Sequence, residues 1–266
     1  MTLPSMVPHD QTTLKKWCRE IDGGPWASVA VPERTTYPSH DLVVQLSAAA
    51  VLTERVRLWT TIVVLPAHSA VDMAKKMASV DRLSDGRLSM GLGVGGREDD
   101  YKALGAPFTR RWSRMDEQVG QMLNIWKGGV PFEGADPVGP PPVQLGGPPL
   151  FGSSMGPKSL ARAAKWAEGI NGAWTINGDA EGVAAGVETV RQAWRDAGRD
   201  GEPHVSTNVW FCLGDGAQET LSNYVHSYMR IFSDDLGRSM GESSRCHTVE
   251  ALVCLLYTSP SPRDRG

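Results

Sequence analysis

The chain has 266 residues, which is long enough for one large α/β domain or two small ones, and its composition shows no break that favours two. Hydrophobic residues make up 41% and charged residues 21%, as in soluble globular proteins with a sizeable core. The net charge of −3, without any run of Lys or Arg, argues against nucleic acid or an anionic membrane as a partner.

The chain carries no apolar stretch of transmembrane length and no signal-peptide pattern, so a cytoplasmic protein is expected. The four cysteines are isolated from one another in the sequence. Such spacing argues against both a zinc site and a disulfide framework.

Short strands that alternate with helices are predicted in the first part of the chain. They are expected over Thr2–Val7, Thr12–Ile21, Trp26–Val31 and Leu42–Thr53. The strand that ends at Val31 delivers Glu33 and Arg34, which would lie where ligands bind if the sheet is parallel. The two residues are equally consistent with a solvated loop pair.

The central stretch predicts a strand, a helix and a second strand. Val56–Leu65 and Arg87–Val94 are apolar, β-branched runs of strand length, and Ser69 can cap the helix between them. Asp85-Gly86 ends that helix. A βαβ unit in one sheet is parallel and right-handed, so the glycines that close the second strand are expected at the ligand-binding edge.

A second amphipathic helix is predicted over Arg114–Trp126, and the residues after it are rich in proline and glycine. This segment, Pro131–Pro149, cannot form regular structure and is too long for a simple connector. It is expected to be a lid or pocket wall on the ligand side.

The last part of the chain predicts further strands near Leu150–Gly152, Glu168–Ile176 and Val205–Leu213. After the first of these, a Gly/Ser turn leads into a helix with Pro157 near its first position, which could cradle a phosphate or simply cap the helix. A helix capped by Asp179 and another marked by Leu221, Tyr224, Tyr228 and Ile231 follow the later strands. Seven strands, most followed by a helix, suit an α/β fold of the TIM-type (β/α)8 barrel class that lacks its eighth unit.

The order of these motifs resembles the luciferase-like monooxygenase superfamily, and most closely its branch that depends on the deazaflavin coenzyme F-420. The similarity runs from about Trp17 to about Phe232 and is carried by residues 53–119, 139–149 and 152–169. The resemblance implies one barrel domain over residues 1–253, with an insertion at 131–149. It also implies a small-molecule substrate, no nucleic-acid or membrane partner, and a homodimer for the full-length protein.

Within such a barrel the resemblance places a flavin or deazaflavin at the carboxyl ends of the strands. It implies a bulge with a non-prolyl cis peptide near Thr61-Ile62, and contacts from the loop that follows Gly93 and from the helix start near Gly152. The implied cofactor-binding residues are Thr60, Thr61, Ile62, Gly93, Gly95, Gly96, Gly152, Ser153, Ser154, Met155 and Gly156. His68 and Glu98 stand near positions that are polar and close to substrate in some members, although His68 could equally be a helix-entry residue.

The resemblance leads to three hypotheses for function. The first is an oxidoreductase that moves a hydride between coenzyme F-420 and a small organic substrate, with the Pro-rich segment shielding the ring from water. The second is a monooxygenase that uses reduced flavin mononucleotide (FMN), and the third is a flavin- or deazaflavin-binding barrel without turnover. The tail from Cys254 to Gly266 resembles a translated sequencing adapter, so the natural protein is expected to continue beyond about Val253 with its missing unit.

Overall fold

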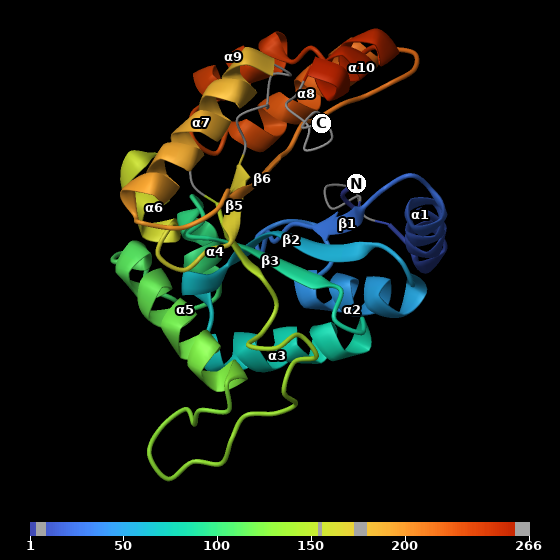
Figure 1. The fold of residues 1–266 in the computed structure, drawn as a ribbon. Coiled ribbons are helices and arrows are strands. Elements are labelled where there is room, and N and C mark those ends of the chain that lie inside the picture. Colours follow the sequence, from blue (N-terminus) through green and yellow to red (C-terminus); the bar gives the residue numbers. More distant parts are fainter. Residues whose placement is uncertain (4–8, 154–155, 173–179, 259–266) are drawn as a thin grey trace. The chain divides into compact units, whose positions relative to one another are not determined.

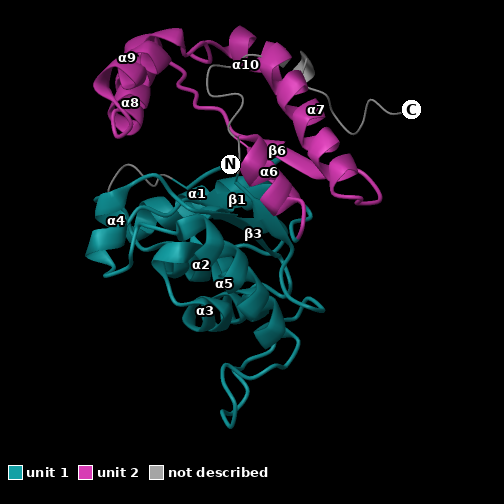
Figure 2. Ribbon diagram, turned by 90° about the vertical axis from the view of Figure 1, so that its left-hand side faces the viewer, with its two compact units in different colours: residues 1–153, 166–168 teal, residues 154–165, 169–266 magenta. Residues whose placement is uncertain are grey.

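The computed structural model describes residues 1–3, 9–153, 156–172 and 180–258. Its contacts divide the chain into two compact units (Figure 2). Unit 1 holds residues 1–153 and 166–168, and unit 2 holds residues 154–165 and 169–266.

Unit 1 is built on four parallel strands, which lie in the sheet in the order of the sequence. The strands are β1 (Ser28–Val31), β2 (Arg57–Val64), β3 (Leu88–Gly93) and β4 (Leu150–Gly152). Thr2 adds an isolated parallel bridge to Ala30, whereas residues 4–7 of the expected first strand lie outside the described residues. All four strands therefore point their carboxyl ends toward one edge.

Helices cover this sheet and bury the core against it (Figure 1). The helical segments are α1 (Gln11–Gly23), α2 (Leu42–Leu52), η1 (Leu65–Ala67), α3 (Ala70–Leu83), α4 (Glu98–Ala103) and α5 (Arg111–Trp126). Ser69 caps α3 as expected, and Asp85 and Gly86 adopt positive φ angles of 52° and 77° just beyond its end. Since β2 and β3 are parallel neighbours joined through α3, the predicted βαβ unit is confirmed.

The Pro-rich segment between α5 and β4 forms no helix or strand, as predicted, but its expected place on the ligand side is wrong. Its Val143 and Gln144 bind Asp81 near the end of α3. The Gln144 side chain also bonds Leu88 and Arg57, the first residues of β3 and β2. The segment thus lies at the amino ends of the strands, opposite the edge where ligands bind (Figure 1).

Unit 2 contains the parallel strands β5 (Gly169–Gly172) and β6 (His204–Thr207) and five helices among its described residues. The helices are α6 (Pro157–Ala163), α7 (Ala180–Asp196), α8 (Ala217–Met229), α9 (Asp234–Ser243) and α10 (Val249–Thr258). The proposed cap Asp179 and the end of the expected strand at 173–176 lie outside the described residues.

Two expectations for unit 2 need correction. The strand expected over Val205–Leu213 ends at Thr207. The chain turns away from the sheet there, and Trp210 packs against α8. The buried face of α8 is formed by Leu221, Val225 and Met229, whereas Ile231 lies beyond the helix end. Across the part of the chain that the structure describes, no helix has both the length and the hydrophobicity of a membrane span.

Candidate functional site

The carboxyl edge of the unit 1 sheet is shaped first by a bulge in β2. The register between β2 and β3 shifts between Thr60 and Val63, and the Thr61–Ile62 peptide bond is cis, as the resemblance implied. The buried Thr60 donates its hydroxyl to the carbonyl oxygen of Gly91 at 2.8 Å. The bulge leaves Thr61 and Ile62 only half-buried.

The glycines at the end of β3 are required by this bulge. A Cβ atom on Gly93 would lie 2.0 Å from Cδ1 of Ile62, so no larger residue fits beneath that side chain as it stands. Gly95 has a φ of +61°, and a Cβ atom there would lie 2.8 Å from Cγ1 of Val64. The β3 turn therefore passes close to β2 with its own backbone partly accessible.

The end of β4 meets the same glycines. The Ser153 amide donates to the carbonyl oxygen of Leu92 at 2.8 Å, and Cβ of Ser153 lies 3.4 Å from the Cβ position of Gly93. Thr61, Ile62, Gly93, Gly95 and Ser153 are thus gathered at one edge. Gly152 is buried beside them at the end of β4, and Gly96 is exposed in the β3 turn.

The remaining residues of the expected phosphate cradle belong to unit 2 or are not described. Ser154 and Met155 lie outside the described residues. Gly156 precedes α6, and Pro157 occupies the start of that helix, as the sequence predicted. The cradle itself stays a prediction.

A half-buried acid and imidazole pair borders the edge of unit 1. Glu33 follows β1 and His68 follows η1, and Nε2 of His68 lies 2.5 Å from Oε1 of Glu33. The other carboxylate oxygen of Glu33 accepts from the backbone N–H of Val64 at 2.6 Å. The side chains of His68 and Glu33 are 17% and 11% exposed, so Glu33 is not a solvated loop residue. His68 stands directly before the cap of α3, and a role in catalysis stays a prediction.

Helix α5 holds the backbone around His68. The Gln118 side-chain amide donates to the carbonyl oxygen of His68 at 2.7 Å, and the Arg114 guanidinium donates to the carbonyl oxygens of Pro66 and Pro107. These contacts fix the position from which the imidazole projects. These contacts of Gln118 and Arg114 were not predicted from the sequence, because the amphipathic pattern of this helix is explained by its apolar face alone.

Glu98 lies apart from this pair in the contacts of the described residues. Its carboxylate is 56% exposed and lies 3.4 Å from Nζ of Lys102, one turn further along α4. The buried acid of this segment is Asp100, which accepts from the backbone N–H and the hydroxyl of Thr36 and lies 3.6 Å from Nε of Arg97. Asp100 therefore ties the loop after β1 to the turn after β3.

The chemistry of this edge fits a flat ring. Accessible backbone at Gly95 and Gly96, next to the small or apolar side chains of Thr61, Ile62 and Ser153, offers a surface on which a planar group can lie. The Glu33–His68 pair beside it can hold or move a proton. In the described residues no group of three or more His, Cys, Asp and Glu side chains could hold a metal ion.

Comparison with known proteins identifies the family. Residues 10–250 match the family model for luciferase-like monooxygenases. The chain belongs to this family. Parallel β/α units and a cis peptide in a strand bulge are what the resemblance implied, and the fold class is that of the family's TIM-type barrels.

Relatives of known sequence and structure agree with this assignment. An uncharacterized protein of Mycobacterium tuberculosis is 30% identical over 183 residues, which are 66% of this chain and 64% of that protein. The chain thus spans just under two thirds of the length of this relative.

Solved structures share the fold of this luciferase-like chain. An F420-dependent secondary alcohol dehydrogenase in complex with an F420-acetone adduct superimposes with a TM-score of 0.78 at 17% identity, over 97% of this chain and 87% of that one. The oxygenating constituent of 3,6-diketocamphane monooxygenase from Pseudomonas putida, in complex with FMN, gives a TM-score of 0.68 at 16% identity, over 95% and 81%.

Proposed function

We propose that this luciferase-like protein is an oxidoreductase that moves a hydride between coenzyme F-420 and a small organic substrate such as an alcohol. The observation that carries the proposal is the half-buried Glu33–His68 pair beside the accessible edge of β2, β3 and β4. Oxidation of an alcohol removes a hydride from carbon and a proton from oxygen, so a positioned proton acceptor is needed. The likeness to an F420-dependent alcohol dehydrogenase supports this choice of chemistry.

In this proposal the cofactor carries the hydride, and the side chains of this chain carry the proton. When bound, the deazaflavin supplies the carbon that accepts or returns the hydride. Nε2 of His68 is held by Glu33, which leaves Nδ1 as the ring nitrogen that takes the substrate proton. The Glu33 carboxylate, fixed by the Val64 N–H, orients the imidazole.

An FMN-dependent monooxygenase is the second candidate. It is supported by the fold shared with the FMN-bound Pseudomonas putida protein and by a flavin-dependent trigonelline monooxygenase component of Acinetobacter baylyi, which is 30% identical over 116 residues. Those residues are 40% of this chain and 32% of the relative. A cofactor-binding barrel without turnover is the third.

Two measurements test these alternatives. Titration of the protein with oxidised F-420 and, separately, with FMN is followed by absorbance, and we expect saturable binding of F-420 at lower concentration. Turnover of secondary alcohols is then followed by F-420 reduction. Binding of FMN without F-420 would reverse the order of the first two candidates, and tight binding without any turnover would favour the third.

Variants assign the proton acceptor. His68→Gln and Glu33→Gln are expected to lower kcat by about 10²- to 10⁴-fold while the dissociation constant of F-420 changes little. Glu117→Gln is the matched control, because the Glu117 side chain is 66% exposed on α5. Full activity of His68→Gln would remove the imidazole from the mechanism.

A further inference from the structure

Helices α8 and α9 of unit 2 form a tightly packed hairpin. A Cβ atom on Gly237 would lie 2.8 Å from the backbone oxygen of His226, and one on Gly241 would lie 2.5 Å from that of Ser222. Two glycines one turn apart therefore let α9 rest directly on the backbone of α8. Packing this close fixes where the two ends of the hairpin emerge.

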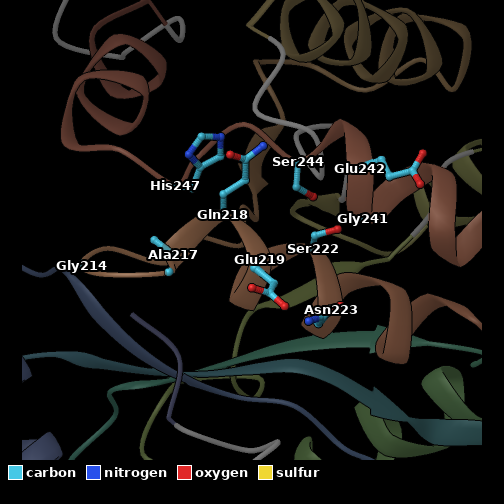
Figure 3. Close-up of a pocket in the computed structure, with 11 residues that line it drawn as sticks. Gly214, Ala217, Gln218, Glu219, Ser222, Asn223, Gly241, Glu242, Ser244 and His247 are labelled. Atoms are coloured by element: carbon cyan, nitrogen blue, oxygen red, sulfur yellow. The ribbon is translucent and has the colours of Figure 1, made fainter.

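The two ends border one pocket of about 700 Å³. Figure 3 shows Gly214 and Ala217 at the start of α8 on one side of it, with Ser244 and His247 from the segment after α9 nearby. The chain that enters the hairpin and the chain that leaves it therefore lie close together.

A backbone hydrogen bond between two cysteines joins these ends. The Cys212 amide donates to the carbonyl oxygen of Cys246 at 3.1 Å, and both thiols are free. A single N–H···O=C bond of this length keeps the two Cα atoms within about 7 Å of each other, the separation beyond which a disulfide needs backbone movement. Cys246 is also the central residue of a tight turn, in which the His247 amide donates to the carbonyl oxygen of Arg245 at 2.8 Å.

We propose that Cys212 and Cys246 are a redox modification site, at which a hydroperoxide converts the two thiols into an intramolecular disulfide. The bond would join the segment before α8 to the turn after α9 and close the hairpin into a ring. It would also fix the rim of the pocket, since Gly214 and His247 lie within two residues of the two cysteines.

The chemistry balances with hydrogen peroxide as the oxidant. Cys212 is half-buried and Cys246 is 2% exposed, and burial raises the pKa of the Cys246 thiol, so Cys212 is the thiol that meets the peroxide. The Cys212 sulfur attacks one peroxide oxygen, the O–O bond breaks, and the second oxygen leaves as water. Cys212 is then a sulfenic acid. The Cys246 sulfur then displaces hydroxide, which takes the thiol proton and leaves as a second water.

Peptide mapping tests this site without any cofactor, so its outcome is independent of the proposed function. The reduced protein is treated with a few equivalents of hydrogen peroxide, free thiols are alkylated under denaturing conditions, and the digest is analysed by mass spectrometry. We expect a Cys212–Cys246 peptide pair that dithiothreitol releases, and a fall in titratable thiols from four to two.

Variants separate this pair from the other thiols. Cys254→Ser removes an exposed thiol on α10 and is expected to leave the cross-link intact. Cys246→Ser is expected to stop the reaction at the Cys212 sulfenic acid, which a dimedone-type reagent traps. Full alkylation of both cysteines after peroxide, oxidation to sulfinic acid without a cross-link, or a bond to Cys254 would each overturn the proposal.

Discussion

Replacement of Asp81 by Asn tests whether the Pro-rich segment is structural. The Asp81 carboxylate is fully buried; one oxygen accepts from the backbone N–H groups of Val143 and Gln144 at 2.8 and 3.0 Å, and the other accepts from the Gln144 side chain at 2.7 Å. Asparagine keeps one acceptor but turns an N–H₂ group toward the Gln144 amide. Two charge-assisted bonds become neutral, at about 1 kcal/mol each, and one buried donor loses its partner, at about 1–3 kcal/mol.

The sum is about 3–5 kcal/mol of unfolding free energy, which at about 2–4 °C per kcal/mol for a unit of this size lowers Tm by roughly 6–20 °C. Thermal unfolding by circular dichroism measures it, and the dissociation constant of F-420 is measured on the same sample below the transition. We expect a lower Tm and an unchanged dissociation constant, because the segment lies at the amino ends of the strands.

Asp72→Asn on the same helix is the control for this prediction. Asp72 forms an exposed pair with Lys76, so its replacement should change stability by less than about 1 kcal/mol. Unchanged stability of Asp81→Asn would refute the structural role of the Pro-rich segment. Lost cofactor binding at an unchanged Tm would also refute it, and would favour the earlier hypothesis that the segment is a lid over the cofactor.

Three further predictions concern unit 1. Arg87→Lys is expected to lower the free energy of unfolding in urea by about 1–3 kcal/mol, and an unchanged midpoint would contradict this. The guanidinium makes five hydrogen bonds of 2.7–2.9 Å, two of them to backbone oxygens at the end of α2, whereas an ammonium has only three donors. Gly93→Ala is expected to lose about 1–3 kcal/mol by overpacking against Ile62 and to weaken F-420 binding, and retention of both properties would show that Ile62 moves aside freely. Burial raises the pKa of Tyr101 to about 12. The folded state then holds the phenolic proton above the unfolded pKa of about 10, so this contribution to stability is full below pH 10 and falls as the pH rises from 10 to 12. Tyr101→Phe should lose this part of the pH dependence of stability, and identical pH profiles of the two proteins would contradict the raised pKa.

The sequence by itself determined the local elements and the family. Caps such as Ser69, the positive φ angles at Asp85-Gly86 and the β-branched runs of β2 and β3 act within a few residues, so their pattern predicts structure before the chain folds. The motif order also located the bulge at Thr61-Ile62. The place predicted for the Pro-rich segment was wrong, because a segment that leads from a helix into the start of a parallel strand reaches the amino edge of the sheet and not the ligand side.

Only the tertiary structure decided which distant residues meet. Glu33 and His68 lie 35 residues apart, Thr36 and Asp100 lie 64 apart, and neither pair has a spacing that a helix or strand imposes. The same holds for Cys212 and Cys246, which are joined only after α8 and α9 pack through their glycines. Local propensity acts through neighbouring backbone groups, whereas these contacts depend on how the strands align and the helices pack, and no short stretch of sequence carries that information.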